Sequence, residues 1–227
     1  MITIEKGKNY GEIVDAAEAA TIDLYNRVAK NYTGFSDGFW NESLELFQKT
    51  LGKGRVIEIG CGNGRDAKLF LEHEFGYVGF DASSEMLRVA QENVPKGSFY
   101  LADARDLSFL EEDQFDGFWS VATLFHVQKI SMWHVLYELR KTTKPGGIGF
   151  ISLQVIHTSD ENDEEILTEK FFGEEECSRF LSYYTKEEFK GMLDEVGFET
   201  LSISVKEEDS STKKDWLCCL IRNTKTN

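Results

Sequence analysis

Short apolar runs alternate with segments of helical spacing along the middle of the chain. The apolar runs have the length of strands and lie at residues 55–59, 76–81, 97–103, 115–122 and 146–155. The helical segments lie at residues 67–74, 83–94 and 131–142. Because strands that alternate with helices form a parallel sheet covered on both faces, this pattern predicts an α/β fold of the doubly wound, Rossmann-like type.

The two ends of the chain depart from this alternation. Apolar spacing predicts one helix over 16–30 and a second helix after Asp37, both before the first strand. Near the other end, a helix over 185–198 is followed by strands at 199–205 and 216–222. The loop between these strands is too short and too polar for a crossover helix, so the last strand is expected to be antiparallel. The whole pattern predicts a mostly parallel sheet of seven strands.

The connection between the fifth strand and the last helix has a different composition. Residues 157–180 are acidic and show no regular apolar spacing, so we expect an irregular segment there. A chain of 227 residues suits one α/β domain. We expect residues 1–50 to form an N-terminal helical cap segment and residues 51–227 to form a single globular domain.

The cysteines and the lengths of the apolar runs indicate the cellular compartment in which the protein is expected. Cys61, Cys177, Cys218 and Cys219 form no C-x-x-C pair, and no histidine stands at metal-ligand spacing from them. This predicts reduced thiols, no metal site and a cytoplasmic protein. No apolar run reaches about 18 residues, and the first residues lack a signal-peptide pattern, so no membrane partner is expected.

The charge of the chain bears on its partners. The net charge is −15 and the pI is about 4.7. Binding to nucleic-acid phosphates requires clustered lysine and arginine, so this balance disfavours a nucleic-acid partner, although a local basic patch stays open. The acidity is also explained by solubility alone.

The stretch VIEIGCGNGRD, residues 56–66, places three glycines between a strand and a helix. Gly60, Gly62 and Gly64 form G-x-G-x-G, and Arg65 occupies the place of the third glycine in a dinucleotide fingerprint. Strand, glycines and helix together place backbone N–H groups against a ligand. The structural alternative is a tight strand-to-helix turn whose glycines serve packing.

Two acids follow at the ends of the next two strands. Asp81 stands where nucleotide-binding folds place an acid on ribose hydroxyls, and Ser83 and Ser84 are available to cap the following helix in its place. Asp103 ends the third strand, where an acid can accept a hydrogen bond from an adenine amino group or cap a turn. These positions share the carboxyl edge of the sheet, where open α/β folds bind ligands.

Five stretches together resemble the successive motifs of the class I S-adenosylmethionine-dependent methyltransferases. They are VIEIGCGNGRD, VGFDASSEML, LADARDL, FDGFWSVATLFHV and LRKTTKPGGIGFISL, and the tail from Tyr183 also fits. The resemblance implies that S-adenosylmethionine is the cofactor and that the chain is an enzyme. It implies cofactor contacts from Glu58, Gly60, Cys61, Gly62, Gly64, Asp81, Ala82, Met86, Asp103, Ala104, Ser120 and Tyr32.

Within that resemblance, the roles divide along the cofactor. The glycines would approach the methionine portion, and Asp81 would hold the ribose with Met86 near the adenine. Asp103 and Ala104 would bind the adenine edge, and Ser120 would lie beside the sulfonium.

The acceptor side is less defined by sequence. His126 follows the fourth strand, and an unperturbed histidine pKa suits proton transfer near neutrality, so His126 is the candidate general base. Its alternative is a structural histidine that orients a loop. Tyr25, Arg179, Tyr183 and Tyr184 are candidate substrate-binding residues, because an arginine beside tyrosines suits an anionic acceptor. Their alternative is core packing and a solvated charge.

The lid over such a site is expected from residues flanking the core. We expect residues 171–184 to border the acceptor pocket, with Arg179 and one of Tyr183 or Tyr184 facing it.

Several functions remain open at this point. A (Asp/Asn/Ser)-Pro-Pro motif after the fourth strand is typical of DNA and protein amino-methyltransferases, but the only prolines are Pro95 and Pro145. A small-molecule acceptor methylated by in-line transfer is therefore favoured. The alternatives are an RNA methyltransferase acting on tRNA and a non-catalytic cofactor-binding module. The acceptor atom stays open, and so does the choice between a monomer and a homodimer.

Overall fold

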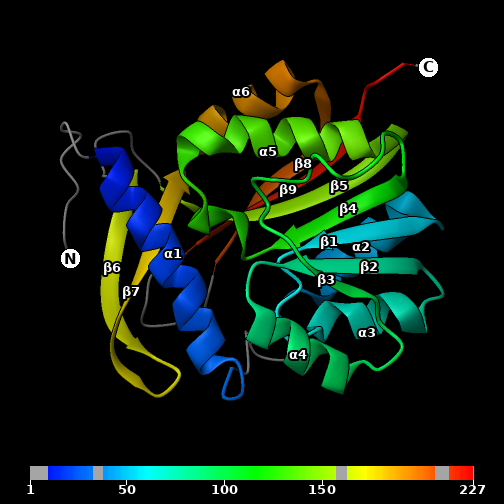
Figure 1. Ribbon diagram of the computed structural model, residues 1–227. Coiled ribbons are helices and arrows are strands. Elements are labelled where there is room, and N and C mark those ends of the chain that lie inside the picture. The colour runs from blue at the N-terminus through cyan, green and yellow to red at the C-terminus, as the bar shows by residue number, and fades with distance from the viewer. Residues whose placement is uncertain (1–9, 33–37, 157–162, 208–214, 227) are drawn as a thin grey trace.

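The structure is a computed structural model that describes residues 10–32, 38–156, 163–207 and 215–226. Its helices are α1 (Tyr10–Val28), α2 (Asn41–Leu51), α3 (Arg65–Glu72), α4 (Ser84–Asn93), α5 (Lys129–Thr142) and α6 (Lys186–Val196), with a short 3-10 helix η1 (Leu124–His126) (Figure 1). Its strands are β1 (Arg55–Ile59), β2 (Gly76–Asp81), β3 (Phe99–Leu101), β4 (Phe115–Val121), β5 (Thr143–Val155), β6 (Glu164–Phe171), β7 (Glu174–Tyr184), β8 (Phe198–Lys206) and β9 (Trp216–Asn223).

The described strands form one nine-stranded sheet. β3, β2, β1, β4 and β5 are parallel neighbours in that order. β9 pairs antiparallel with β5, and β8 pairs antiparallel with β9. These seven strands confirm the expected mostly parallel sheet with its antiparallel last strand. In Figure 1, α5 and α6 cover one face, while α2, α3 and α4 lie on the other.

The remaining two strands correct the expectation of an irregular segment over 157–180. β6 and β7 form an antiparallel hairpin in which Leu167 lies opposite Arg179, and the end of β7 pairs with the end of β5. The turn consists of Phe172 and Gly173, both at positive φ, 42° and 97°. Phenylalanine rarely adopts this conformation, so the sequence carried no turn signature. Residues 157–162 lie outside the described residues.

The start of β5 also differs from the sequence expectation. The fifth strand was expected over 146–155, but β5 already begins at Thr143 and so includes Lys144 and Pro145. The irregularity appears instead as a register shift against β4 between Phe115 and Gly117. The pairing thus accommodates the proline at the beginning of the strand, where a missing N–H donor is tolerated.

A cluster of aromatic side chains forms the core beneath the carboxyl ends of the central strands. Phe118 and Trp119 of β4 are fully buried, and the ring of Trp119 stacks on Phe150 at 4.5 Å between centroids. Phe47 of α2 and Phe70 of α3 pack on the same indole. Each such side chain contributes about 1.5–3 kcal/mol by burial, so the ends of β1, β2 and β4 are held by a rigid floor.

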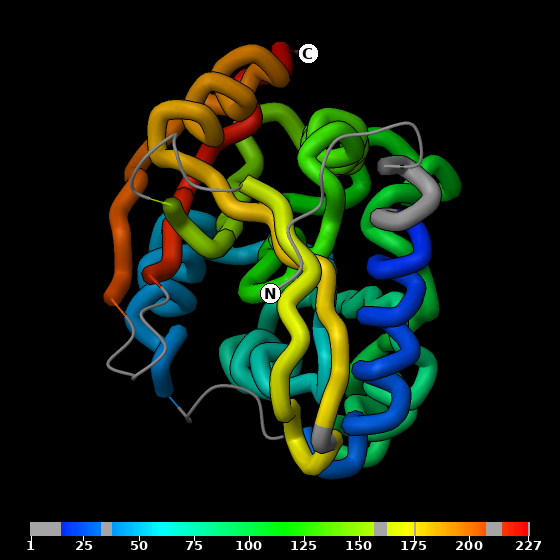
Figure 2. The backbone as a smooth tube through the Cα atoms, turned by 90° about the vertical axis from the view of Figure 1, so that its left-hand side faces the viewer, coloured from blue at the N-terminus to red at the C-terminus, as the bar shows by residue number. Residues whose placement is uncertain are grey.

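Helix α1 packs away from this core. Leu24 and Val28 cluster with Met86 of α4 and Cys177 of β7, and Ala17 packs on Phe180. Figure 2 shows α1 running beside the β6–β7 hairpin, and Figure 1 shows it between that hairpin and α4. The helix therefore crosses the carboxyl edge of the sheet. The domain division at residue 50 stays a prediction.

None of the helices in the described part of the chain is long and apolar enough to cross a membrane.

Candidate active site

A cavity lies at the carboxyl ends of β1, β2 and β4, between the sheet and α1. The structure brings most of the predicted site residues to its lining: Tyr25, Tyr32, Glu58, Gly60, Cys61, Gly62, Asp81, Ala82, Met86, Asp103, Ala104 and His126. Segments separated by up to a hundred residues thus meet at one edge of the sheet, as expected for an open α/β fold.

The glycine loop forms the floor of this cavity where β1 ends. A side chain at Gly60, whose φ is 77°, would collide with Thr123 after β4, so only glycine allows the two segments to approach. Gly62 has φ 52° and faces open space, with nothing within 4 Å of the position of a Cβ. Gly62 therefore leaves bare backbone exposed to a ligand. Gly64 precedes α3, packs towards Ala90 and does not line the cavity.

Asp81 ties this loop to the end of β2. Its carboxylate accepts hydrogen bonds from the backbone N–H of Gly62 and of Ser83, both at 2.8 Å. Burial raises the pKa of Asp81, and these backbone hydrogen bonds oppose the rise. Ser83 caps α4 through the N–H of Met86. Since a carboxylate offers about four lone-pair sites, Asp81 retains capacity for ligand hydroxyls.

Two buried groups under the loop do not act as free ionised side chains. Glu58 accepts a hydrogen bond from the Tyr77 hydroxyl, and burial raises its pKa well above the ordinary value. Burial also raises the pKa of the Cys61 thiol well above its ordinary value. Burial therefore disfavours the ionised form of both side chains, including the thiolate that a nucleophilic cysteine requires.

Asp103 differs from the sequence expectation because an arginine already occupies its carboxylate. Arg105 donates to Asp103 through its backbone N–H and its Nε, each at 2.9 Å. Burial opposes ionisation here, but the hydrogen bonds from Arg105 prevail and lower the pKa of Asp103. An adenine amino group at this edge would meet an Asp103–Arg105 pair instead of a free acid.

The same arginine reaches helix α1. Arg105 pairs with Glu18, whose side chain is buried and also accepts from the backbone N–H of Gln128 at 2.9 Å and from its side-chain amide at 3.0 Å. These contacts link α1 to the loops after β3 and β4. They fasten the helix over the cavity.

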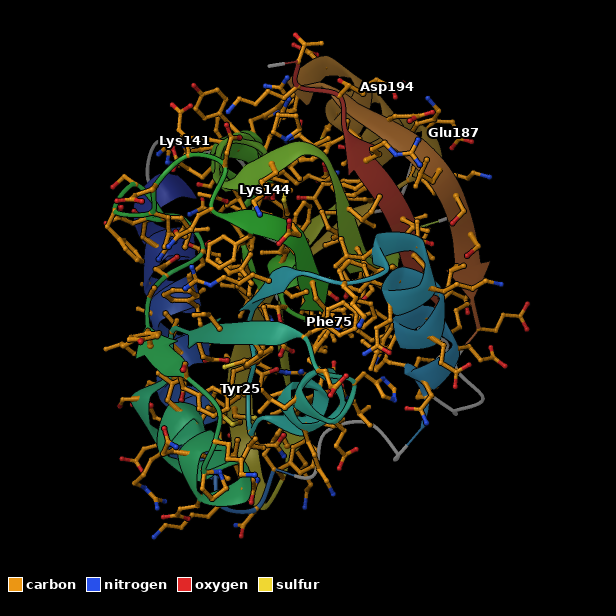
Figure 3. The ribbon with its side chains drawn as sticks, turned by 90° about the vertical axis from the view of Figure 1, so that its right-hand side faces the viewer. Tyr25, Phe75, Lys141, Lys144, Glu187 and Asp194 are labelled. Carbon is orange, nitrogen blue, oxygen red and sulfur yellow. The ribbon has the colours of Figure 1, made fainter. Side chains whose placement is uncertain are left out.

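Aromatic side chains close the cavity from the side of α1. The Tyr25 hydroxyl lies 3.0 Å from Nε2 of His126, and the Tyr25 and Tyr32 rings pack edge to face. Phe171 and Phe172 of the hairpin pack on these tyrosines. Tyr25, labelled in Figure 3, packs against the cluster that includes Met86 of α4. The arrangement limits water near the glycine loop.

Besides Gly64, four predicted residues lie outside the lining. Ser120 is fully buried and donates to the carbonyl of Ile59 at 3.0 Å, so it holds β4 against β1. The Tyr183 hydroxyl pairs with Glu165, and Tyr184 is buried against Phe189. We therefore do not retain Ser120, Tyr183 or Tyr184 as ligand-binding residues.

Arg179 is the fourth residue outside the lining. It is buried, pairs with Glu169, and its guanidinium lies 4.1 Å from the centroid of the Phe171 ring. Its charge acts on the Tyr25 hydroxyl. Arg179 is thus close to the acceptor side of the cavity, although Tyr25 stands between them.

Sequence reasoning missed several lining residues, namely Glu18, Thr21, Ile22, Asn63, Arg65, Arg105 and Thr123. A usable signal existed for the first three, since Glu18, Thr21, Ile22 and Tyr25 share one helical face. The others lie within the motif stretches themselves. Arg65 is held by both carboxylate oxygens of Asp66, at 2.6 and 2.8 Å.

The site agrees with comparisons to known proteins. Residues 56–147 match a family model described as a methyltransferase domain. The fold is similar to that of 1,6-didemethyltoxoflavin-N1-methyltransferase from Burkholderia thailandensis, solved with S-adenosylhomocysteine. The TM-score is 0.72 at 16% identity, over 99% of this chain and 94% of that chain. The matched segment and the fold support the resemblance to the class I S-adenosylmethionine-dependent methyltransferases.

The curated relatives match only part of this chain. The 27-O-demethylrifamycin SV methyltransferase of Amycolatopsis mediterranei is 26% identical over 54% of this chain and 56% of its own length. The trans-aconitate 2-methyltransferase of an Azoarcus species is 27% identical over 50% of this chain and 44% of its own. The chain spans about half the length of these two relatives.

Proposed function

We propose that this methyltransferase binds S-adenosylmethionine in the cavity at the carboxyl edge of its sheet and transfers the methyl group to a small-molecule acceptor. The observation that carries the proposal is the hydrogen bond from Gly62 to Asp81. This hydrogen bond places the backbone of Gly62 and the carboxylate of Asp81 side by side in the lining of the cavity. The bond uses the Gly62 N–H to fix the glycine loop beside the carboxylate, and the carboxylate keeps acceptor capacity for ribose hydroxyls.

The lining divides into a cofactor side and an acceptor side. Gly60 and Gly62 would hold the methionine portion, Asp81 the ribose, and Met86 with Ala104 the adenine. The face of α1 that carries Tyr25 would cover the sulfonium and leave the acceptor beside His126. The bound cofactor supplies an activated methyl group, so alignment and exclusion of water are the main tasks of the chain.

Three observations support a small-molecule acceptor. Helix α1 and the hairpin lie over the carboxyl edge of the sheet, which narrows the approach of a polymer to the cavity. The relatives described above are named for a rifamycin and for trans-aconitate, and the structural neighbour was solved with 1,6-didemethyltoxoflavin. The net charge of −15 also disfavours an RNA substrate.

The four cysteines support the expected reducing compartment. All four are free and buried in the described part of the chain. This agrees with a cytoplasmic enzyme, which we propose on that ground.

Calorimetric titration with S-adenosylhomocysteine tests the cofactor proposal. We expect binding by the parent chain and a loss of at least about tenfold in affinity for Asp81→Ala, because the loop loses its anchor and the ribose its acceptor. Asp194→Ala is the matched control, since Asp194 lies on α6 and pairs with Lys190 at the surface. A folded parent chain that does not bind S-adenosylhomocysteine would overturn the proposal.

A further inference from the structure

The imidazole of His126 is held between two oxygen atoms. Its Nδ1 lies 2.8 Å from the carbonyl oxygen of Phe180 on β7, and its Nε2 lies 3.0 Å from the Tyr25 hydroxyl. A backbone carbonyl only accepts hydrogen bonds, so Nδ1 must carry the proton of the neutral ring. Nε2 is then the basic nitrogen, and Tyr25 donates its hydroxyl proton to it.

Tyr25 consequently presents an oxygen whose proton points away from the acceptor. Both Tyr25 and His126 line the cavity. The charged groups that act on the tyrosine are Arg179 from β7, Glu169 from β6 and Asp81 from β2. Burial raises the pKa of Tyr25, and the charge of Arg179 opposes that rise. The phenol is therefore neutral at rest, which suits a group that passes a proton on rather than one that stores a negative charge.

We infer that the methyl acceptor carries a proton on its attacking atom, as a hydroxyl or an N–H group, and that Tyr25 and His126 remove this proton as a relay. The inference rests on the proposed function. As the acceptor atom forms its bond to the methyl carbon, the bond from that carbon to sulfur breaks. The acceptor proton passes to the Tyr25 oxygen, the Tyr25 proton passes to Nε2 of His126, and the imidazolium later loses one proton to solvent.

The same geometry disfavours a carboxylate acceptor. Carboxylates are ionised at neutral pH and need no base, but a site for them needs a cation that faces the cavity. Arg179 was the expected cation, yet it pairs with Glu169, stacks on Phe171 and does not line the cavity. It is a positioning residue that acts through Tyr25. The arginines that do line the cavity are already paired, Arg65 with Asp66 and Arg105 with Asp103 and Glu18.

The hairpin supplies the parts that make this relay possible. Phe180 provides the carbonyl that fixes the His126 tautomer, and its own N–H donates to the Thr21 hydroxyl of α1 at 2.9 Å. Arg179 directly precedes Phe180 on β7. The relay is therefore assembled from α1, η1 and β7, with β7 lying outside the seven-stranded core of the fold.

Nitrogen NMR of the histidine rings tests the relay without a known acceptor. In the S-adenosylhomocysteine complex of the ¹⁵N-labelled full chain, we expect neutral His126 to show a protonated Nδ1 and an unprotonated Nε2. The signals are assigned by their absence in His126→Gln. Tyr25→Phe should shift the Nε2 signal, while Tyr183→Phe should leave it unchanged, because the Tyr183 hydroxyl pairs with Glu165. A neutral ring protonated at Nε2 would overturn the relay.

A labelling experiment tests the acceptor class. The chain is incubated with methyl-labelled S-adenosylmethionine and a metabolite extract, and the products are treated with mild alkali, which releases methanol from methyl esters only. We expect alkali-stable label, reduced about 100-fold in Tyr25→Phe and in His126→Gln and unchanged in Tyr183→Phe. Label found only in methyl esters contradicts the inference.

Cofactor affinity separates the two proposals. Tyr25→Phe should bind S-adenosylhomocysteine within about twofold of the parent chain, since the relay acts on the acceptor. If the parent chain fails to bind, the proposed function fails. If binding is intact and transfer survives in both relay variants, only the relay fails. An extract that yields no labelled product speaks against the proposed transfer, and the imidazole spectrum then decides the relay.

Discussion

The backbone N–H of Gly62 lies 2.8 Å from the carboxylate of Asp81, so the glycine loop and the acid at the end of β2 form one unit. The loop conformation depends on an acid 19 residues away in the chain. A ligand that binds the carboxylate therefore also contacts the loop it holds.

The two glycines that line the cavity should respond differently to alanine. Gly60→Ala should lower the melting temperature by several degrees, because its methyl group collides with Thr123. Gly62→Ala has open space and should cost only about 1 kcal/mol for its left-handed backbone. The Gly62→Ala variant should nevertheless bind S-adenosylhomocysteine at least about tenfold more weakly, because the added methyl group enters the proposed cofactor space. Thermal unfolding and calorimetry check both variants, and a Gly62→Ala chain that binds like the parent contradicts this placement.

Glu18 should control how firmly α1 closes the site. Glu18→Gln removes the charge that holds Arg105 and weakens the contact with Gln128. Since Arg105 is one-third exposed, we expect the free energy that holds α1 over the cavity to fall by about 1–2 kcal/mol. Faster dissociation of S-adenosylhomocysteine, measured by stopped flow, is the expected result.

Asp23→Asn serves as the control for this experiment. Asp23 lies on the same helix and also pairs with an arginine, but its side chain is 66% exposed. An exposed pair contributes little, so dissociation should stay at the parent rate. Equal effects from both variants would show that Glu18 is not a specific fastening point.

The Asp103–Arg105 pair should appear in the acid unfolding of the protein. Because the pKa of Asp103 is lowered in the folded chain, its stabilising contribution is present above the unfolded value of about 3.9 and is lost as pH falls through the folded value. Asp103→Asn should therefore destabilise the chain at pH 7. The difference from the parent should shrink as the pH falls below that unfolded value and be lost once the pH lies below the folded value. Urea unfolding across this range measures it, and a pH-independent difference would contradict the pairing.

The parallel core of the fold was predictable because its signals are local. Phe118 and Trp119 lie in an apolar run that is typical of a strand buried on both faces, and Thr185 caps α6 through the N–H of Glu188 as the capping box predicts. The hairpin was missed because its turn places Phe172 at positive φ. Along β6 the acids and the apolar residues stand in pairs, as in Glu164-Glu165-Ile166-Leu167, so the sequence shows no period-two strand pattern.

The cofactor side of the site was also more predictable than the acceptor side. Motif positions locate Gly62 and Asp81, since strand ends share one edge of the sheet. Side-chain pairing is not local, so the sequence did not reveal that Arg105 holds Asp103 or that Ser120 turns toward Ile59. Arg65 was noted only as a departure from a dinucleotide motif.

That departure gives a prediction about cofactor choice. Arg65 takes the place of the third glycine of a dinucleotide loop, begins α3 and is fixed by Asp66. NAD should therefore cause no thermal shift under conditions in which S-adenosylhomocysteine stabilises the chain. Equal shifts from the two ligands would argue against a site selective for S-adenosylmethionine.

A crystal structure of the chain with S-adenosylhomocysteine tests the central claim most directly. We expect the ribose hydroxyls on the carboxylate of Asp81 and the homocysteine portion against the backbone of Gly60 and Gly62, with the sulfur directed toward Tyr25 and His126. Density for the ligand at any other place, with this cavity filled by side chains, would contradict the account.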